Sequence, residues 1–303
     1  MKNRKKIQKK TERLFSKIHT KQMNKNIFFR LSNLLNHNFL GLNKNFFKSK
    51  YCLDAASGLN ANATVNMLNM GAKHVCLFDM NKKILTLTKK FLSSKFSKSK
   101  FSIKKSNLLK IGYPDNHFDF VHCAGAIHHT VNIKKSISEL CRVTKKGGTL
   151  YLEYYGYGGI ARKIVDLLRT TYKKDIQFKR FIDQLDINTF KKIKNFIKSE
   201  NLKFKINKFS KKEYNSFEKY LDYDLILTIQ DRIKSPMYTQ IKYSEVKKIL
   251  KSKGFIKIKR VSKFPIFENI RKYLSPFYRN HNNYYSKILY GEGMPQILAE
   301  KNK

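Results

Sequence analysis

Residues 51–60 read YCLDAASGLN, and this stretch decides the fold. A short apolar run ends in Asp54, and four small residues then form a tight turn before a helix that begins near Asn60. A second apolar run, residues 75–78, ends in Asp79. Strand, turn, helix, strand and acid in this order form the first half of a doubly wound nucleotide-binding sheet. Gly58 lets a ligand approach the backbone, and an acid about 20 residues later is placed to reach a ribose hydroxyl.

The turn does not fit a dinucleotide. A dinucleotide fingerprint is G-x-G-x-x-G, whereas this turn has one glycine, and Asp54 would repel a pyrophosphate. A ligand with a positively charged end is favoured. The residues resemble the glycine-rich motif of class I S-adenosylmethionine (AdoMet)-dependent methyltransferases, D-x-G-x-G-x-G. Ala56 and Asn60 stand where that family usually has its first and third glycines.

Later segments extend the resemblance. Residues 106–108, SNL, follow a predicted strand at 101–105, where the family often has an acidic or amide residue facing adenine. Residues 114–130, PDNHFDFVHCAGAIHHT, resemble the family's fourth motif. Residues 137–150, ISELCRVTKKGGTL, resemble the helix and turn that lead into strand five, which is predicted at Thr149 to Tyr154. The resemblance is specific over roughly residues 48–160.

The resemblance implies a Rossmann-like, seven-stranded, mostly parallel α/β sheet with helices on both faces. The implied strand order is 3-2-1-4-5-7-6, with the last strand antiparallel. AdoMet is the implied cofactor. The residues implied to bind it are Asp54, Ala56, Ser57, Gly58, Asp79, Met80, Asn107, Leu108 and Ala124.

The resemblance also assigns roles to these residues. Asp54 is expected to attract the methionyl ammonium group, and Asp79 to accept hydrogen bonds from the ribose hydroxyls, with Met80 beneath the adenine. The side-chain oxygen of Asn107 is expected to accept from the exocyclic amine of adenine. His128, at the end of strand four, is the candidate catalytic base, because histidine titrates near neutral pH. Transfer without any protein base is the other reading.

Four segments are predicted along the chain: a helical N-terminal extension (1–47), the AdoMet-binding core (48–159), a mainly helical insertion that caps the substrate (160–245), and the C-terminal part of the core sheet (246–303). In the extension, Leu14, Phe15 and Ile18 recur at helical spacing, as do Phe28, Leu31, Leu34 and Leu35. Such helices either cap the cofactor pocket or pack on the sheet, and the sequence leaves both readings open.

The insertion carries the candidate acceptor contacts. Residues 191–212 are rich in lysine but amphipathic. The acids Asp222, Asp224 and Asp231, the last followed by Arg232, contact either the substrate or nearby lysines. Just before the insertion, Tyr155 and Tyr157 either wall a substrate pocket or cover a sheet edge. Tyr223 and Tyr238 suit the apolar wall of the same pocket.

The composition of the chain limits the kinds of partner that it can bind. The chain has 303 residues, 53 Lys and 11 Arg among 64 basic residues, and a formal net charge of +43. Lysines spread along the chain favour a solvated surface, and predict at most weak, non-specific association with nucleic acid or anionic surfaces. Four cysteines without a C-x-x-C pair indicate reduced thiols in the cytoplasm and no metal site. No apolar run is long enough for a transmembrane segment.

The predicted function is therefore methyl transfer to a small-molecule acceptor, with O-, N- and C-methylation all open. One alternative is an RNA methyltransferase acting on ribose or base. The usual base-methylation turn, Asn/Asp-Pro-Pro-aromatic, is replaced by CAGA at 123–126, and no Pro-Cys pair occurs, whereas ribose methylation stays open. The other alternative is a non-catalytic module that binds AdoMet.

Overall fold

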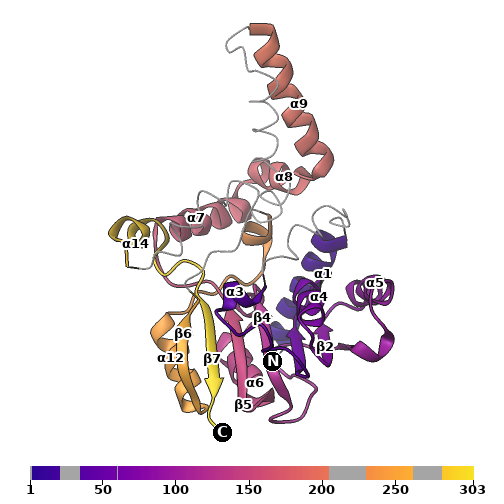
Figure 1. Ribbon diagram of the computed structural model, residues 1–303. Coiled ribbons are helices and arrows are strands. Elements are labelled where there is room, and N and C mark those ends of the chain that lie inside the picture. The colour runs from indigo at the N-terminus through magenta and orange to yellow at the C-terminus, as the bar shows by residue number, and fades with distance from the viewer. Residues whose placement is uncertain (1, 21–34, 60, 205–229, 262–281) are drawn as a thin grey trace.

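The computed structural model describes residues 2–20, 35–59, 61–204, 230–261 and 282–303. In these ranges seven strands form one sheet (Figure 1). They are β1 (Tyr51–Ala55), β2 (His74–Asp79), β3 (Phe101–Lys105), β4 (Phe118–Ala124), β5 (Thr144–Glu153), β6 (Phe255–Arg260) and β7 (Gln296–Lys301). Their order is β3-β2-β1-β4-β5-β7-β6, and β7 runs antiparallel to both of its neighbours. The predicted fold class and strand order are confirmed.

Helices cover both faces because the strand residues alternate between two apolar cores. On one face Cys76 and Phe78 of β2 pack in a cluster with α6 (Ile133–Val143) and α12 (Tyr243–Ser252). On the other face Val75 and Leu77 pack toward α3 (His37–Leu40), α4 (Asn62–Asn69) and α5 (Lys82–Ser93). The buried cysteines of the strands belong to these cores.

Strand β5 is longer than the sequence predicts, since it begins at Thr144 instead of Thr149. Residues 144–148 continue the strand beside an irregularity in its register with β4, between Phe118 and Phe120. A Cβ atom at Gly148 would lie 2.8 Å from the carbonyl oxygen of Lys145 and 3.0 Å from that of Phe118. The pair Gly147–Gly148 therefore lies within the strand, at a register irregularity where Gly148 has no room for a Cβ atom. It does not form only a turn before the strand.

Four further helices lie at the carboxyl ends of the parallel strands (Figure 1). They are α7 (Ile160–Lys174), α8 (Ile176–Gln184), α9 (Ile187–Phe204) and α14 (Tyr284–Tyr290). The segment after β5 is thus mainly helical where it is described, and α9 projects away from the sheet. The N-terminal helix α1 (Lys2–Thr20) lies beside α5. Phe28, Leu31, Leu34, Tyr223, Asp222 and Asp224 lie outside the described residues, as does Asn60.

Candidate cofactor and acceptor site

A cavity of about 270 Å³ lies where β1, β2 and β4 end. This is the edge at which an open α/β sheet binds its ligands. Eight of the nine residues predicted to bind the cofactor line it: Ala56, Ser57, Gly58, Asp79, Met80, Asn107, Leu108 and Ala124. The ninth, Asp54, does not. The fold therefore brings together residues from four separate segments of the sequence.

The turn after β1 forms the floor of the cavity. Gly58 has φ +64°, and a Cβ atom built there would meet nothing within 4 Å, so the backbone is open to a ligand. Ala56 has φ 58°, in the left-handed region that costs a residue with a Cβ atom about 1–2 kcal/mol. Thr88 of α5 holds the turn from behind, because its hydroxyl donates to the carbonyl oxygen of Leu59 at 3.1 Å.

Asp79 is fixed at the end of β2. Its Oδ2 accepts from the backbone N–H of Gly58 at 3.2 Å, and its Oδ1 accepts from that of Asn81 at 3.0 Å. These two bonds fix the orientation of the Asp79 carboxylate at the cavity. The role predicted for Asp79, accepting from ribose hydroxyls, fits this geometry.

Asp54 is buried and turned toward α4. Its Oδ2 accepts from the backbone N–H and the hydroxyl of Thr64 at 3.1 and 2.8 Å, and its Oδ1 lies 3.1 Å from Nδ1 of His122. A carboxylate beside the first turn of a helix also complements the helix dipole. Asp54 thus positions the start of α4 beneath the turn, and its predicted contact with the ammonium group is not supported by these bonds.

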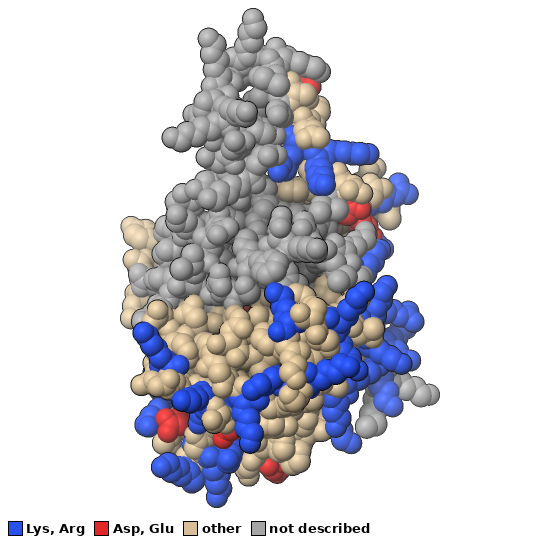
Figure 2. Space-filling view, turned by 45° about the vertical axis from the view of Figure 1, so that its right-hand side comes forward, with Lys and Arg blue, Asp and Glu red and all other residues tan. Residues whose placement is uncertain are grey.

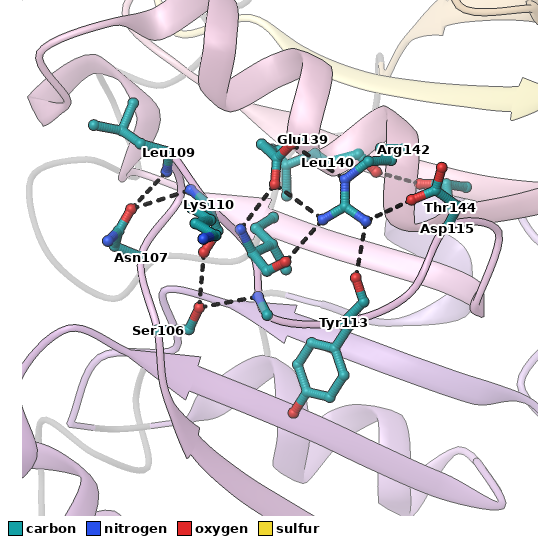
Figure 3. Close-up of polar contacts among 12 residues, drawn as sticks. Ser106, Asn107, Leu109, Lys110, Tyr113, Asp115, Glu139, Leu140, Arg142 and Thr144 are labelled. Carbon is teal, nitrogen blue, oxygen red and sulfur yellow. Dashed lines mark hydrogen bonds and ion pairs between the residues drawn. The ribbon is translucent and has the colours of Figure 1, made fainter.

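Asn107 lines the cavity, but its side-chain oxygen is already engaged (Figure 3). It accepts from the backbone N–H groups of Leu109 and Lys110 at 2.8 and 3.2 Å. Both lone pairs of the amide oxygen are therefore used in a local turn. The prediction that this oxygen accepts from the adenine amine is not supported, although the residue lies at the predicted wall.

A pair of charged residues on α6 holds that wall in place. The guanidinium of Arg142 donates to both oxygens of Glu139, at 3.1 and 2.9 Å, and to the carbonyl oxygens of Ile111 and Tyr113, each at 2.8 Å (Figure 3). Glu139 in turn accepts from the N–H of Ile111 at 2.9 Å. The sequence contains this pair in the segment ISELCRV, yet its positioning role emerges only once the loop after β3 is seen beside α6.

Helix α1 closes the cavity opposite the turn. Gln8, Thr11, Glu12 and Phe15 all line it. Of the two readings left open for the N-terminal helices, α1 matches the cap of the pocket, whereas α3 packs on the sheet. The helical spacing of Leu14, Phe15 and Ile18 predicts an apolar face of this helix. It does not predict that the polar residues before Leu14 also line the cavity.

The two histidines after β4 differ. His128 is 1% exposed, stacks on Tyr155 with ring centroids 3.6 Å apart, and does not line the cavity. Burial, followed by His129 and the nearby Arg162 and Arg232, lowers the pKa of His128 well below its ordinary value. His128 is therefore neutral near pH 7. Its catalytic role stays a prediction that these surroundings do not favour.

His129 lines the cavity with its ring, beside Phe15 at a centroid distance of 4.9 Å. Its nitrogens face the segment that returns from the insertion. Nδ1 lies 2.9 Å from both the carbonyl oxygen of Met237 and Oγ of Ser235, and Nε2 lies 3.3 Å from Oδ1 of Asp231.

Two backbone hydrogen bonds hold the same returning segment. The N–H of Thr239 donates to the carbonyl oxygen of His128, and that of Ile241 donates to the carbonyl oxygen of Tyr155. The histidine pair therefore anchors residues 231–241 onto the strand ends.

The tyrosines predicted to lie in this region differ in their burial. Tyr155 is buried, with its ring centroid 4.9 Å from that of Tyr238, whereas Tyr157 is 54% exposed. Tyr155 and Tyr238 thus form a wall between core and insertion, and Tyr157 does not take part in it. Asp231 contacts a histidine instead of a lysine.

Basic side chains are not confined to one part of the described surface. Lys and Arg side chains are scattered over the described surface in Figure 2, without a single continuous stripe on that face. All four cysteines are buried and unpaired. In the described ranges no group of three or more potential metal ligands occurs. Within the same ranges no helix is long and apolar enough to cross a membrane.

The chain is similar to several known proteins. Residues 53–152 match the Methyltransf_11 methyltransferase domain. The ubiquinone/menaquinone biosynthesis C-methyltransferase UbiE of Francisella tularensis subsp. novicida is 26% identical over 98 residues, which are 32% of this chain and 37% of the relative. UbiE of Francisella philomiragia is 25% identical over 126 residues, which are 41% of this chain and 48% of the relative. The crystal structure of YcgJ from Bacillus subtilis aligns with a TM-score of 0.47 at 14% identity, covering 88% of this chain and 100% of that one.

The matches span less than half the length of these curated relatives. The Methyltransf_11 match covers most of β1 to β5 and the residues that line the cavity, except those of α1. Residues 53–152 therefore correspond to the Methyltransf_11 methyltransferase domain, and the strand order of the sheet is the one that the resemblance to class I AdoMet-dependent methyltransferases implies.

Proposed function

We propose that this chain is an AdoMet-dependent methyltransferase that acts on a small-molecule acceptor. The observation that carries the proposal is the cavity at the ends of β1, β2 and β4, whose lining includes the turn residues, Asp79 and the loop at 106–109. The same cavity is covered by α1 and bordered by His129, to which the returning segment of the insertion is bonded. A covered site suits an acceptor small enough to be enclosed.

The residues present fit the cofactor. The open Cβ position at Gly58 admits a ligand against the backbone, and two backbone bonds orient the Asp79 carboxylate at the same cavity. Leu108 and Met80 offer apolar surface at the same cavity. AdoMet supplies an electrophilic methyl group on a sulfonium when bound. We propose that Ala56, Ser57, Gly58, Asp79, Met80, Asn107, Leu108 and Ala124 bind it, with Asp54 acting through the turn.

The protein's contribution is then positioning and exclusion of water. Neither histidine offers a nitrogen to the cavity, because those of His129 face residues 231–237 and His128 does not line it. Holding the nucleophile in line with the methyl group is the main rate effect in such a site, and a base is needed only for some acceptors. We propose that Phe15 and the other α1 residues keep water out.

The acceptor itself does not follow from the relatives. Their name describes C-methylation in ubiquinone and menaquinone biosynthesis. The matched segment, however, holds the residues that we propose bind the cofactor, whereas we propose that acceptor contacts come from α1 and the insertion. O-, N- and C-methylation therefore stay open. We also propose a cytoplasmic setting, which the four unpaired thiols support.

Labelled transfer tests the proposal. The purified chain is incubated with methyl-labelled AdoMet and a cell extract separated into small-molecule, RNA and protein fractions, with Asp79→Ala as the matched variant. We expect label in the small-molecule fraction with the wild type, and much less with Asp79→Ala. Label only in RNA would favour an RNA methyltransferase, and AdoMet binding without any transfer would favour a non-catalytic module. Folding of a 160–245 deletion tests the proposed division into core and cap.

A further inference from the structure

Three of the chain's 11 arginines gather at one place between the core and the insertion. The guanidinium carbon of Arg162 lies 4.2 Å from the ring centroid of Tyr155, and that of Arg232 lies 5.6 Å from the same centroid. The guanidinium carbon of Arg169 lies 5.1 Å from the ring centroid of Tyr238. In a chain whose positive charge is mostly lysine, this concentration of arginine is a distinct feature.

The cluster has little neutralising charge. Among the described residues none of the three arginines forms an ion pair with a carboxylate. The carboxylate of Asp231 acts electrostatically on Arg169 and Arg232, and its Oδ1 lies 3.3 Å from Nε2 of His129. Asp166 lies one turn from Arg169 on α7 and is exposed. The positive charge of the cluster therefore exceeds the negative charge that the described residues place beside it.

Burial makes this excess costly. Arg162 is 7% exposed, and Nε of Arg232 is buried without a hydrogen-bond partner. Burial also raises the pKa of Tyr155 far above its usual range, so its hydroxyl is neutral and cannot balance a guanidinium. The aromatic faces offset part of the cost, on the order of 0.5–2 kcal/mol for each cation–π contact. An uncompensated buried charge still costs several kcal/mol unless a counter-ion is bound.

The cluster also lies next to the cofactor cavity. His129 lines that cavity, and its ring centroid is 5.8 Å from that of Tyr155, the ring on which Arg162 lies. Arg162 is held there by donating to the Tyr238 hydroxyl at 2.7 Å and to the Gly293 carbonyl oxygen at 2.9 Å. The arginines are thus one aromatic ring beyond the cavity wall, on the side covered by the insertion.

We propose that the methyl acceptor is an anionic small molecule whose carboxylate or phosphate group is bound by Arg162, Arg169 and Arg232. This inference rests on the proposed function. Guanidinium groups match both anions through paired N–H donors. The excess of positive charge over the whole chain then has a use, because it attracts an anionic acceptor toward the site and raises its encounter rate.

Calorimetric titration with phosphate and with acetate tests the site, with ionic strength held constant by chloride. Arg232→Gln and the less buried Arg169→Gln are compared with Arg180→Gln, which removes an exposed arginine of α8. We expect the wild type and Arg180→Gln to bind one of the two anions equally. Loss of one charged donor weakens such binding by at least about tenfold. Circular dichroism and AdoMet titration establish that each variant is folded, and Arg169→Gln carries the test if Arg232→Gln is not.

The labelled product gives a second readout. It should be retained by an anion exchanger at neutral pH, and phosphatase treatment should abolish retention only if the group is a phosphate. A product that is not retained, or anion binding that is absent or unchanged in both cluster variants, would overturn the inference. Failure of the proposed function would give a different result. In that case the wild type would bind no AdoMet or would label no small molecule, whatever the anion titrations give.

Discussion

Replacing Arg142 with alanine tests how the wall of the cavity is held. Its guanidinium donates to Glu139, Asp115 and the carbonyl oxygens of Ile111 and Tyr113. The Asp115 side chain is 68% exposed, so that ion pair contributes little. The bonds to Glu139, whose side chain is 18% exposed, and to two carbonyl groups are the main loss. We expect a loss of about 2–4 kcal/mol in the free energy of unfolding, the scale of breaking a partly buried charged network.

The same change should loosen the loop that carries Asn107 and Leu108, and so weaken AdoMet binding by roughly tenfold, or about 1.4 kcal/mol. Denaturant unfolding measures the first effect and calorimetry the second, with exposed Arg180→Ala as the control. If both quantities stay within error of wild type, Glu139 and Arg142 do not position the loop.

The pH dependence of this loss has a definite sign. Burial raises the pKa of Glu139, but the bonds from Arg142 and from the Ile111 N–H outweigh it and lower the pKa below the ordinary 4.5. Stability from a carboxyl group with a lowered pKa is fully present above its unfolded-state pKa and is lost as pH falls through the folded-state value. The stability difference between wild type and Arg142→Ala should therefore be largest near neutral pH and shrink below about pH 4.

Three further predictions follow from the site. Ala56→Gly should raise the free energy of unfolding by about 1 kcal/mol in thermal or denaturant melts, because glycine adopts the positive φ without strain; a lower stability would contradict this. Phe15→Ala should weaken AdoMet binding about fivefold in calorimetry while the sheet stays folded, and unchanged affinity would remove α1 from the site. Burial raises the pKa of Cys141 to about 12 and that of Cys52 further, so a thiol reagent at pH 8 should label them only in denaturant.

Much of the fold could be predicted from the sequence because its motifs are local. The apolar runs ending in Asp54 and Asp79 became β1 and β2, and the strand order implied by the family resemblance was confirmed. The start of β5 was missed, because the pair Gly147–Gly148 reads as a turn when the crowding by Phe118 is not visible.

Side-chain orientation was harder to predict than position. Asn107 lies at the cavity, but its side-chain oxygen accepts from the backbone N–H groups two and three residues later, and these local bonds compete with any ligand. Asp54 faces α4 because side chains alternate along a strand, which a motif does not state. The arginine cluster joins residues about 70 positions apart, Arg162 and Arg232, so no local pattern could reveal it.

Calorimetric titration of the purified chain with AdoMet, repeated with NAD and with Asp79→Ala, tests the central claim most directly. We expect one AdoMet bound per chain, no NAD binding, and a loss of about 1–3 kcal/mol in binding free energy for Asp79→Ala, the scale of losing charged hydrogen bonds to a ligand. Binding of NAD in place of AdoMet, or an Asp79→Ala variant with undiminished affinity, would contradict the account.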